Sequence, residues 1–182
     1  ATVPAQISAY HEQTSAQHQA QVQALTNNGF RMLTLSIYGS AGSPRYAAVW
    51  VQRAGPAFIP FQDLNAADYQ TLVSSHANTH APTIVTAMGS AANPRFAGVL
   101  EQTGYDVWAL HGLDSQGMKD ACDAAREAGW RIRSADVYNT GADPRYVVTF
   151  KPNPGRVGWG YYLATGVQDH QDPHPVGDPV HG

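Results

Sequence analysis

Three arginines occupy one repeated position of the sequence, each directly after a proline and before an aromatic residue. They are Arg45, Arg95 and Arg145, followed by Tyr46, Phe96 and Tyr146. A guanidinium can bind a carboxylate or sugar hydroxyls and an aromatic face can stack on a ligand, so the pairs could form three equivalent pockets. Alternatively, proline fixes a hairpin turn, arginine bonds loop carbonyls or an acidic side chain of the next unit, and the aromatic enters the core. We favour this structural interpretation, because a repeat fold solves the same packing problem in every unit.

Aromatic residues near loops are a second set of candidates. Stacking on a sugar or a peptide needs an exposed ring, and loop aromatics are better placed for it than those in regular elements. In addition to the three arginines, the candidate ligand contacts are therefore Tyr105, Trp108, Trp159 and Tyr161. Trp130, at a helix-to-strand corner, is expected in the core.

No catalytic or metal-binding constellation is evident. His76 and His80 have i,i+4 spacing, but no third ligand is near them in the sequence, and the His/Asp cluster between 170 and 181 resembles any polar tail. The carboxylates between 120 and 127 fit the solvated face of a helix. Cys122 fits a small buried apolar residue. We expect no catalytic residue, no metal and no cofactor.

The Pro-Arg pairs are spaced fifty residues apart, which indicates a tandem repeat. Each copy combines helical apolar spacing, an alternating strand, a hairpin turn and a second strand, with a short third strand before the next helix. The pattern predicts an α+β fold of three helix-strand-strand repeats with antiparallel hairpins. We expect a single repeat domain over 1–167, with units at 15–62, 63–112 and 113–163, residues 1–14 as a completing strand, and a Pro/His-rich tail at 168–182. A kelch-type propeller has the same period, but its blades have no room for these helices.

Cap residues predict where the helices begin and end. Asn65 and Ser115 are the expected N-caps of the second and third helices. Gly29 and Gly129 fit the left-handed position after a helix, whereas the middle copy has Thr79 there and should end differently. Equal spacing also aligns Val22, Leu72 and Cys122 on the inward faces. Residues 3–7 and 159–163 occupy matching places as short strands, so the two ends of the chain are expected to complete one sheet together.

Composition narrows the partners. The 182 residues carry a net charge of −3, and the eleven Lys and Arg are scattered, which argues against nucleic acid. No apolar run is long enough to cross a bilayer, so we expect no membrane partner. The first residues, Ala-Thr-Val-Pro-Ala-Gln, read like the mature end left by signal cleavage, and only two lysines are present, so we expect a secreted, extracellular protein. The single cysteine leaves no internal disulfide.

The run Tyr-Gly-Ser-Ala-Gly-Ser-Pro-Arg-Tyr-Ala-Ala-Val-Trp at 38–50, with weaker copies ending at 100 and 150, resembles the bacterial tandem repeat and the amino-terminal domain of secreted fungal polyglycine hydrolases. The resemblance covers about residues 15–165. In that family the repeats precede a β-lactamase-like domain with a Ser-x-x-Lys motif. Here Ser115 and Lys119 are one residue too far apart, so we expect this catalytic domain to be absent.

The resemblance implies the accessory repeat part of such a protein. We expect a non-catalytic recognition module that binds a glycan, a cell-wall component or a peptide, with a glycan or an extracellular protein as partner. The alternatives are a hydrolase whose site assembles across repeats and a structural or oligomerising module. The sequence does not specify the oligomeric state.

Overall fold

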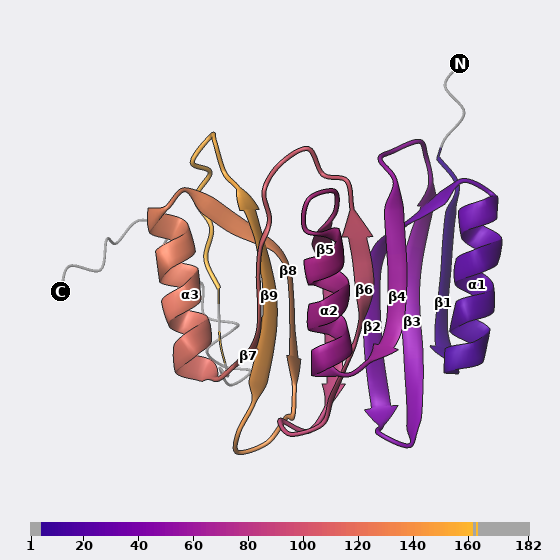
Figure 1. Cartoon of the computed structure of the whole chain (residues 1–182), viewed down its shortest axis with the longest axis horizontal. Coiled ribbons are helices and arrows are strands. Elements are labelled where there is room, and N and C mark those ends of the chain that lie inside the picture. The colour runs from indigo at the N-terminus through magenta and orange to yellow at the C-terminus, as the bar shows by residue number, and fades with distance from the viewer. Residues whose placement is uncertain (1–4, 162, 164–182) are drawn as a thin grey trace, which may run out of the picture.

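The chain folds as three copies of one strand-helix-strand-strand unit (Figure 1). The structure, a computed structural model, describes residues 5–161 and 163. The elements of the first copy are β1 (Ile7–Gln13), α1 (Ser15–Asn27), β2 (Phe30–Ser40) and β3 (Ser43–Gln52). Those of the second are β4 (Phe58–Leu64), α2 (Ala66–His76), β5 (Ala81–Gly89) and β6 (Pro94–Glu101). Those of the third are β7 (Trp108–Leu113), α3 (Ser115–Glu127), β8 (Trp130–Tyr138) and β9 (Arg145–Pro152).

The threefold repetition of a helix with an antiparallel hairpin is confirmed. Strands dominate the described part of the chain, so the α+β label fits loosely. No helix in residues 5–161 is long and apolar enough to cross a membrane. The predicted tail at 168–182, with its His/Asp cluster, lies outside the described residues.

Each repeat has its own three-stranded antiparallel sheet. The strand orders are β1-β3-β2, β4-β6-β5 and β7-β9-β8, so the last strand of each repeat is central and the second is an edge. The prediction that the two chain ends share a sheet is wrong, because β1 pairs with β3 of its own repeat, with Ser8 opposite Trp50. The helix after β1 returns the chain directly to its own hairpin, and the described residues of 159–163 form no strand.

Polar side chains cap all three helices at their first turn. Thr14, Asn65 and Asp114 accept backbone N–H groups of the residues three positions later. The predicted cap Ser115 is wrong by one residue, because the carboxylate of Asp114 binds the N–H of Gly117 at 2.7 Å. The caps are 51 and then 49 residues apart, so the second helix is displaced by one residue relative to equal spacing.

This displacement changes which residues correspond between the helices. Counting from the caps, Val22 corresponds to Val73 and not to the predicted Leu72. The predicted helix ends are confirmed, since Gly29 and Gly129 have φ of 76° and 79°. Thr79 is not left-handed, and the middle helix ends in a different turn, with the N–H of Thr79 bonded to the carbonyl of His76.

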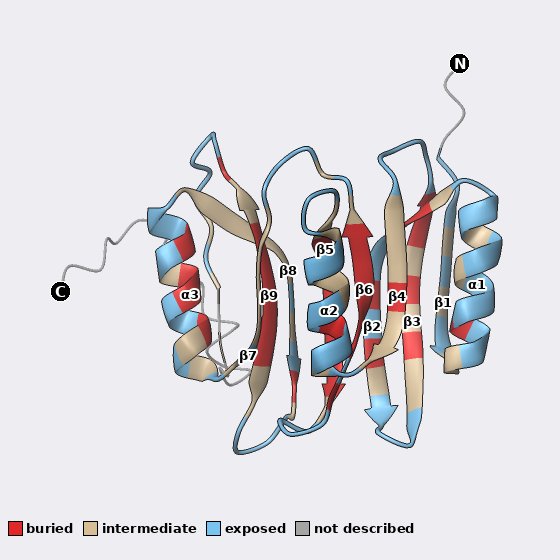
Figure 2. Ribbon diagram, in the orientation of Figure 1, coloured by how far each residue is buried: buried red, intermediate tan, exposed pale blue. Residues whose placement is uncertain are grey.

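The buried residues lie between helix and sheet and between neighbouring sheets (Figure 2). Tyr46, Phe96 and Tyr146, the aromatics after the three arginines, are all buried. The first cluster joins Met32 and Trp50 of repeat 1 to Ile84 and other residues of repeat 2, so the repeats share a core. Sharing a core is what makes stacked repeats mutually stabilising.

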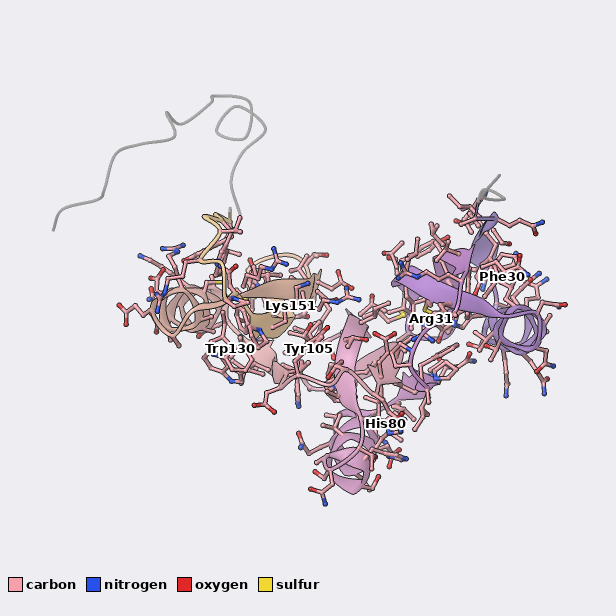
Figure 3. All side chains as sticks on the ribbon, turned by 90° about the horizontal axis from the view of Figure 1, so that it is seen from above. Phe30, Arg31, His80, Tyr105, Trp130 and Lys151 are labelled. Carbon is pink, nitrogen blue, oxygen red and sulfur yellow. The ribbon has the colours of Figure 1, made fainter. Side chains whose placement is uncertain are left out.

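The edge strands β2, β5 and β8 lie innermost, and the helices lie outermost. Figure 3, viewed along the strands, shows three lobes with one helix at the outside of each. β5 packs against both β2 and β8, whereas β2 and β8 make few contacts with each other. The middle repeat therefore bridges the outer two.

Candidate functional site

The repeated arginines contact their own hairpins or a nearby acid. Arg45 donates to Ser43 Oγ at 2.9 Å and to the carbonyl of Pro44 at 3.1 Å. Arg145 pairs with Asp143 at 2.9 Å, and Arg95 lies 3.6 Å from Asp63. The Arg45 contact with a turn carbonyl is what the structural interpretation expected, but Asp63 and Asp143 belong to the arginine's own repeat and not to the next unit. Ligand binding by the three arginines stays a prediction.

Three of the four loop aromatics cover the third core. Trp108 packs on Phe150 with ring centroids 5.2 Å apart. Trp159 donates from Nε1 to the carbonyl of Trp130 at 3.0 Å, and Tyr161 lies beside it, with Arg126 over both rings. These contacts hold the residues after β9 against α3.

Tyr105 differs from the other three because it is 40% exposed. It lies in the loop after β6 and lines a hollow of about 520 Å³ with His80 and Asp106. It is therefore the candidate aromatic with the most accessible ring, although no described contact links it to a ligand role.

The histidine pair and the cysteine considered in the sequence lie at a helix end and in the core. The rings of His76 and His80 are 5.8 Å apart at the end of α2. Within residues 5–161 no group of three or more His, Cys, Asp or Glu could hold a metal ion. Cys122 is fully buried, and burial raises the pKa of its thiol to about 11, which suppresses the reactive thiolate.

A slot at the centre of the molecule, where β2, β5 and β8 converge, is the candidate functional site. It has a volume of about 250 Å³ and is lined by residues of all three strands. Its lining residues include Thr34, Ser36, Ile84, Arg133, Ser134 and Asp136. None of these residues was among the candidates predicted from the sequence.

Two of the three possible junctions between edge strands are closed by side-chain bonds to backbone. At the first, the N–H of Ile37 on β2 donates to Thr86 Oγ1 of β5 at 3.2 Å. At the second, the N–H of Ala87 on β5 donates to Asp136 Oδ2 of β8 at 3.2 Å, and the Thr86 hydroxyl donates to the same oxygen. Thr86 and Asp136 are fifty residues apart in the chain, so each repeat binds the edge of the preceding one through the same position.

The third junction, between β8 and β2, is open. Ser36 is the residue that corresponds to Thr86 and Asp136, and it is exposed, as is Thr34. On β8, Ala135 and Val137 are exposed, whereas β5 is buried on both faces from Pro82 to Met88. No hydrogen bond joins β2 to β8 among the described side chains, and the N–H of Val137 bonds its own neighbour Asp136. The slot is therefore bounded by an uncovered strand edge on β8 and by small hydroxyl side chains on β2.

The slot is lined on one side by Asp136, whose carboxyl group is largely buried. Burial raises the pKa of its carboxyl, opposed by hydrogen bonds from Thr86, Val137 and Ala87. The carboxylate is an acceptor for three donors, which keeps it in place at the junction. The signal for it was present in the sequence, since Ser36, Thr86 and Asp136 are polar residues at one strand position of three aligned copies.

These features define a class: a tandem-repeat domain, mainly of β-structure, in which each unit adds one helix-covered sheet around shared edge strands. The polyglycine hydrolase-like structural repeat model matches residues 5–53, 55–103 and 104–153. The chain belongs to this repeat family, as the sequence resemblance implied. Each matched segment begins before the strand that precedes the helix, in agreement with the sheets.

Proposed function

We propose that the chain is a non-catalytic recognition module whose central slot binds an extended segment of a target polypeptide. The observation that carries the proposal is the open junction between β8 and β2. At the other two junctions an edge strand is covered by side chains of the next repeat, and at this one it is not.

An uncovered strand edge favours an extended chain over a glycan. Backbone N–H and C=O groups at a sheet edge can pair with an added strand, and this gives affinity with little dependence on sequence. On the facing side, Thr34 and Ser36 offer hydroxyl groups at the positions that Ile84 and Thr86 occupy in the closed junction. A bound peptide with small side chains would take the place that Thr86 and Asp136 take at the two closed junctions.

The sequence also led us to expect an extracellular location and a glycan as one possible ligand. The location tells us where the target would be met, and the slot's lining favours a peptide over a glycan. The slot is lined by polar and aliphatic side chains, and Tyr105, the exposed candidate aromatic, lies in a different hollow. An extracellular protein segment is therefore the target we propose.

The test is selection from a phage-displayed random peptide library, followed by titration of the selected synthetic peptides into ¹⁵N-labelled protein. Binding in the slot shifts the amide signals of β2 and β8. Ala135→Pro removes one N–H from the uncovered edge, and Ala135→Ser keeps it. Loss of one backbone hydrogen bond of about 1 kcal/mol weakens binding about fivefold in the proline variant alone. Equal affinity of the two folded variants, or no selected peptide, refutes the proposal.

A further inference from the structure

A cluster of cations lies where β8 and β9 pair, and its member Lys151 is labelled in Figure 3. Arg131 and Lys151 are directly opposite each other in the antiparallel pair, so their side chains share a face. Arg133 follows on β8 and lies 4.0 Å from Glu101, which also binds Arg31 at 2.6 Å. Arg31 balances the charge of Glu101, so Arg131, Arg133 and Lys151 leave an excess of three positive charges here, in a chain whose net charge is −3.

Both oxygens of the Glu101 carboxylate already accept a hydrogen bond from another residue. Its Oε1 accepts from Arg31 and its Oε2 accepts from the hydroxyl of Thr83 at 2.6 Å. Asp136, further along β8, accepts from three donors of the strand junction. Within residues 5–161, neither Arg131 nor Lys151 forms an ion pair.

Part of this cluster is also shielded from water. The Nε of Arg131 is buried and has no hydrogen-bond partner in the described structure. Burial, then Arg131 and Arg133, lower the pKa of Lys151. Like charges directly opposite in a sheet destabilise it, and a buried donor without a partner adds a desolvation penalty. Both effects are relieved if an anion binds between the side chains.

We infer that Arg131, Arg133 and Lys151 form a binding site for a divalent tetrahedral oxyanion, a sulfate or phosphate group. Two guanidinium groups supply paired N–H donors and the ammonium supplies a point charge. A dianion neutralises more of the excess charge than a carboxylate does, and its four oxygens suit donors that come from two strands. This inference does not rest on the peptide slot: Arg133 lines both sites, but Arg131 and Lys151 do not line the slot, and the ligand chemistry differs.

The two lysines of the chain allow a direct test, since Lys119 lies on the exposed side of α3. The full chain labelled at the lysine side chains gives two ammonium-bearing signals. Titration with inorganic sulfate or phosphate at constant ionic strength should shift the Lys151 signal saturably and leave the Lys119 signal unmoved. Acetate and chloride serve as the comparison anions.

Variants separate binding from general screening. Lys151→Met removes the repulsion, so the variant should be at least as stable as the wild type without dianion, while its affinity for sulfate falls about tenfold or more. Lys119→Met should keep the wild-type affinity and the wild-type rise in Tm with sulfate.

Three results would overturn the inference. They are equal shifts of both lysine signals, a response to acetate as large as that to sulfate, and an unchanged sulfate affinity in Lys151→Met. Saturation by either sulfate or phosphate with loss in that variant supports it.

Discussion

His18 is expected to make the free energy of unfolding depend on pH. Its side chain is 1% exposed and stacks on Tyr46 with centroids 4.3 Å apart. Its Nδ1 lies 2.8 Å from the hydroxyl of Tyr10, which accepts from Trp50 Nε1 at 3.2 Å. Trp50 can only donate, so the Tyr10 hydrogen is free to point at Nδ1 of a neutral imidazole. Burial lowers the pKa of His18 to about 4, partly opposed by the charge of Asp63.

The direction of the pH effect follows from this lowered pKa. In the unfolded chain the histidine titrates near 6.5, so between about pH 6.5 and 4 the unfolded state binds a proton that the folded state does not. The stability that the neutral His18 contributes is complete above pH 6.5 and falls as the pH falls. For these two pKa values, linkage gives a loss of about 1 kcal/mol by pH 5.5 and about 2 kcal/mol by pH 4.5.

The third repeat supplies the variant that isolates this effect. Met118 occupies the position that His18 has in the first repeat, four residues after the cap, so His18→Met keeps an apolar side chain over the ring of Tyr46. The free energy of urea unfolding is measured for both proteins at pH 7, 5.5 and 4.5. The difference between wild type and variant should move against the wild type by about 2 kcal/mol across this range. Burial also lowers the pKa of His111, but His111 is present in both proteins and cancels.

His11 offers a control, because it is an exposed histidine on the neighbouring strand. His11→Gln should follow the wild-type pH dependence. If His18→Met and the wild type lose stability in parallel, the imidazole is not held neutral by burial, and the reasoning from its contacts is refuted.

Three further predictions concern the packing of the repeats. Asp136→Ala leaves a hydroxyl and two N–H groups at the junction without their acceptor, so it should lower the free energy of unfolding by about 1–3 kcal/mol in a denaturation assay. Ser36→Ala, at the exposed counterpart, should change the free energy of unfolding by less than about 0.5 kcal/mol in the same assay. Gly98→Ala should destabilise by about 1–3 kcal/mol in thermal unfolding, because the added Cβ would overlap the carbonyl oxygen of Ile84; an unchanged Tm contradicts the tight packing of β5 on β6. Cys122 should react with a thiol reagent only as fast as the protein unfolds, and rapid labelling of the native protein contradicts its burial.

Local pattern was enough to predict the repeat and most of its elements. Equal spacing of the Pro-Arg pairs predicted three copies, and the left-handed glycines after the helices were predicted correctly because only local backbone geometry requires them. The cap of the third helix was misplaced by one residue because Asp114 and Ser115 are both good caps. Only the fold decides which of two adjacent polar residues has the extended backbone.

The grouping of strands into sheets needed the tertiary structure. The sequence predicts a short strand before each helix, but it does not show whether that strand joins the sheet of the preceding hairpin or of the following one. Both choices bury the same apolar residues. In the structure the short strand joins the sheet of the following hairpin. β1 therefore pairs with β3, and the two ends of the chain do not meet in one sheet.

The sequence by itself determined the unit, its length, its turn residues and the buried aromatic after each arginine, because these depend on contacts within one copy. The tertiary structure alone decided what differs between copies that look alike. Ser36, Thr86 and Asp136 hold one position, yet Thr86 and Asp136 close junctions while Ser36 is exposed, because no hydrogen bond among the described side chains joins β2 to β8. Arg131 and Lys151 likewise become one charged site only when β8 pairs with β9.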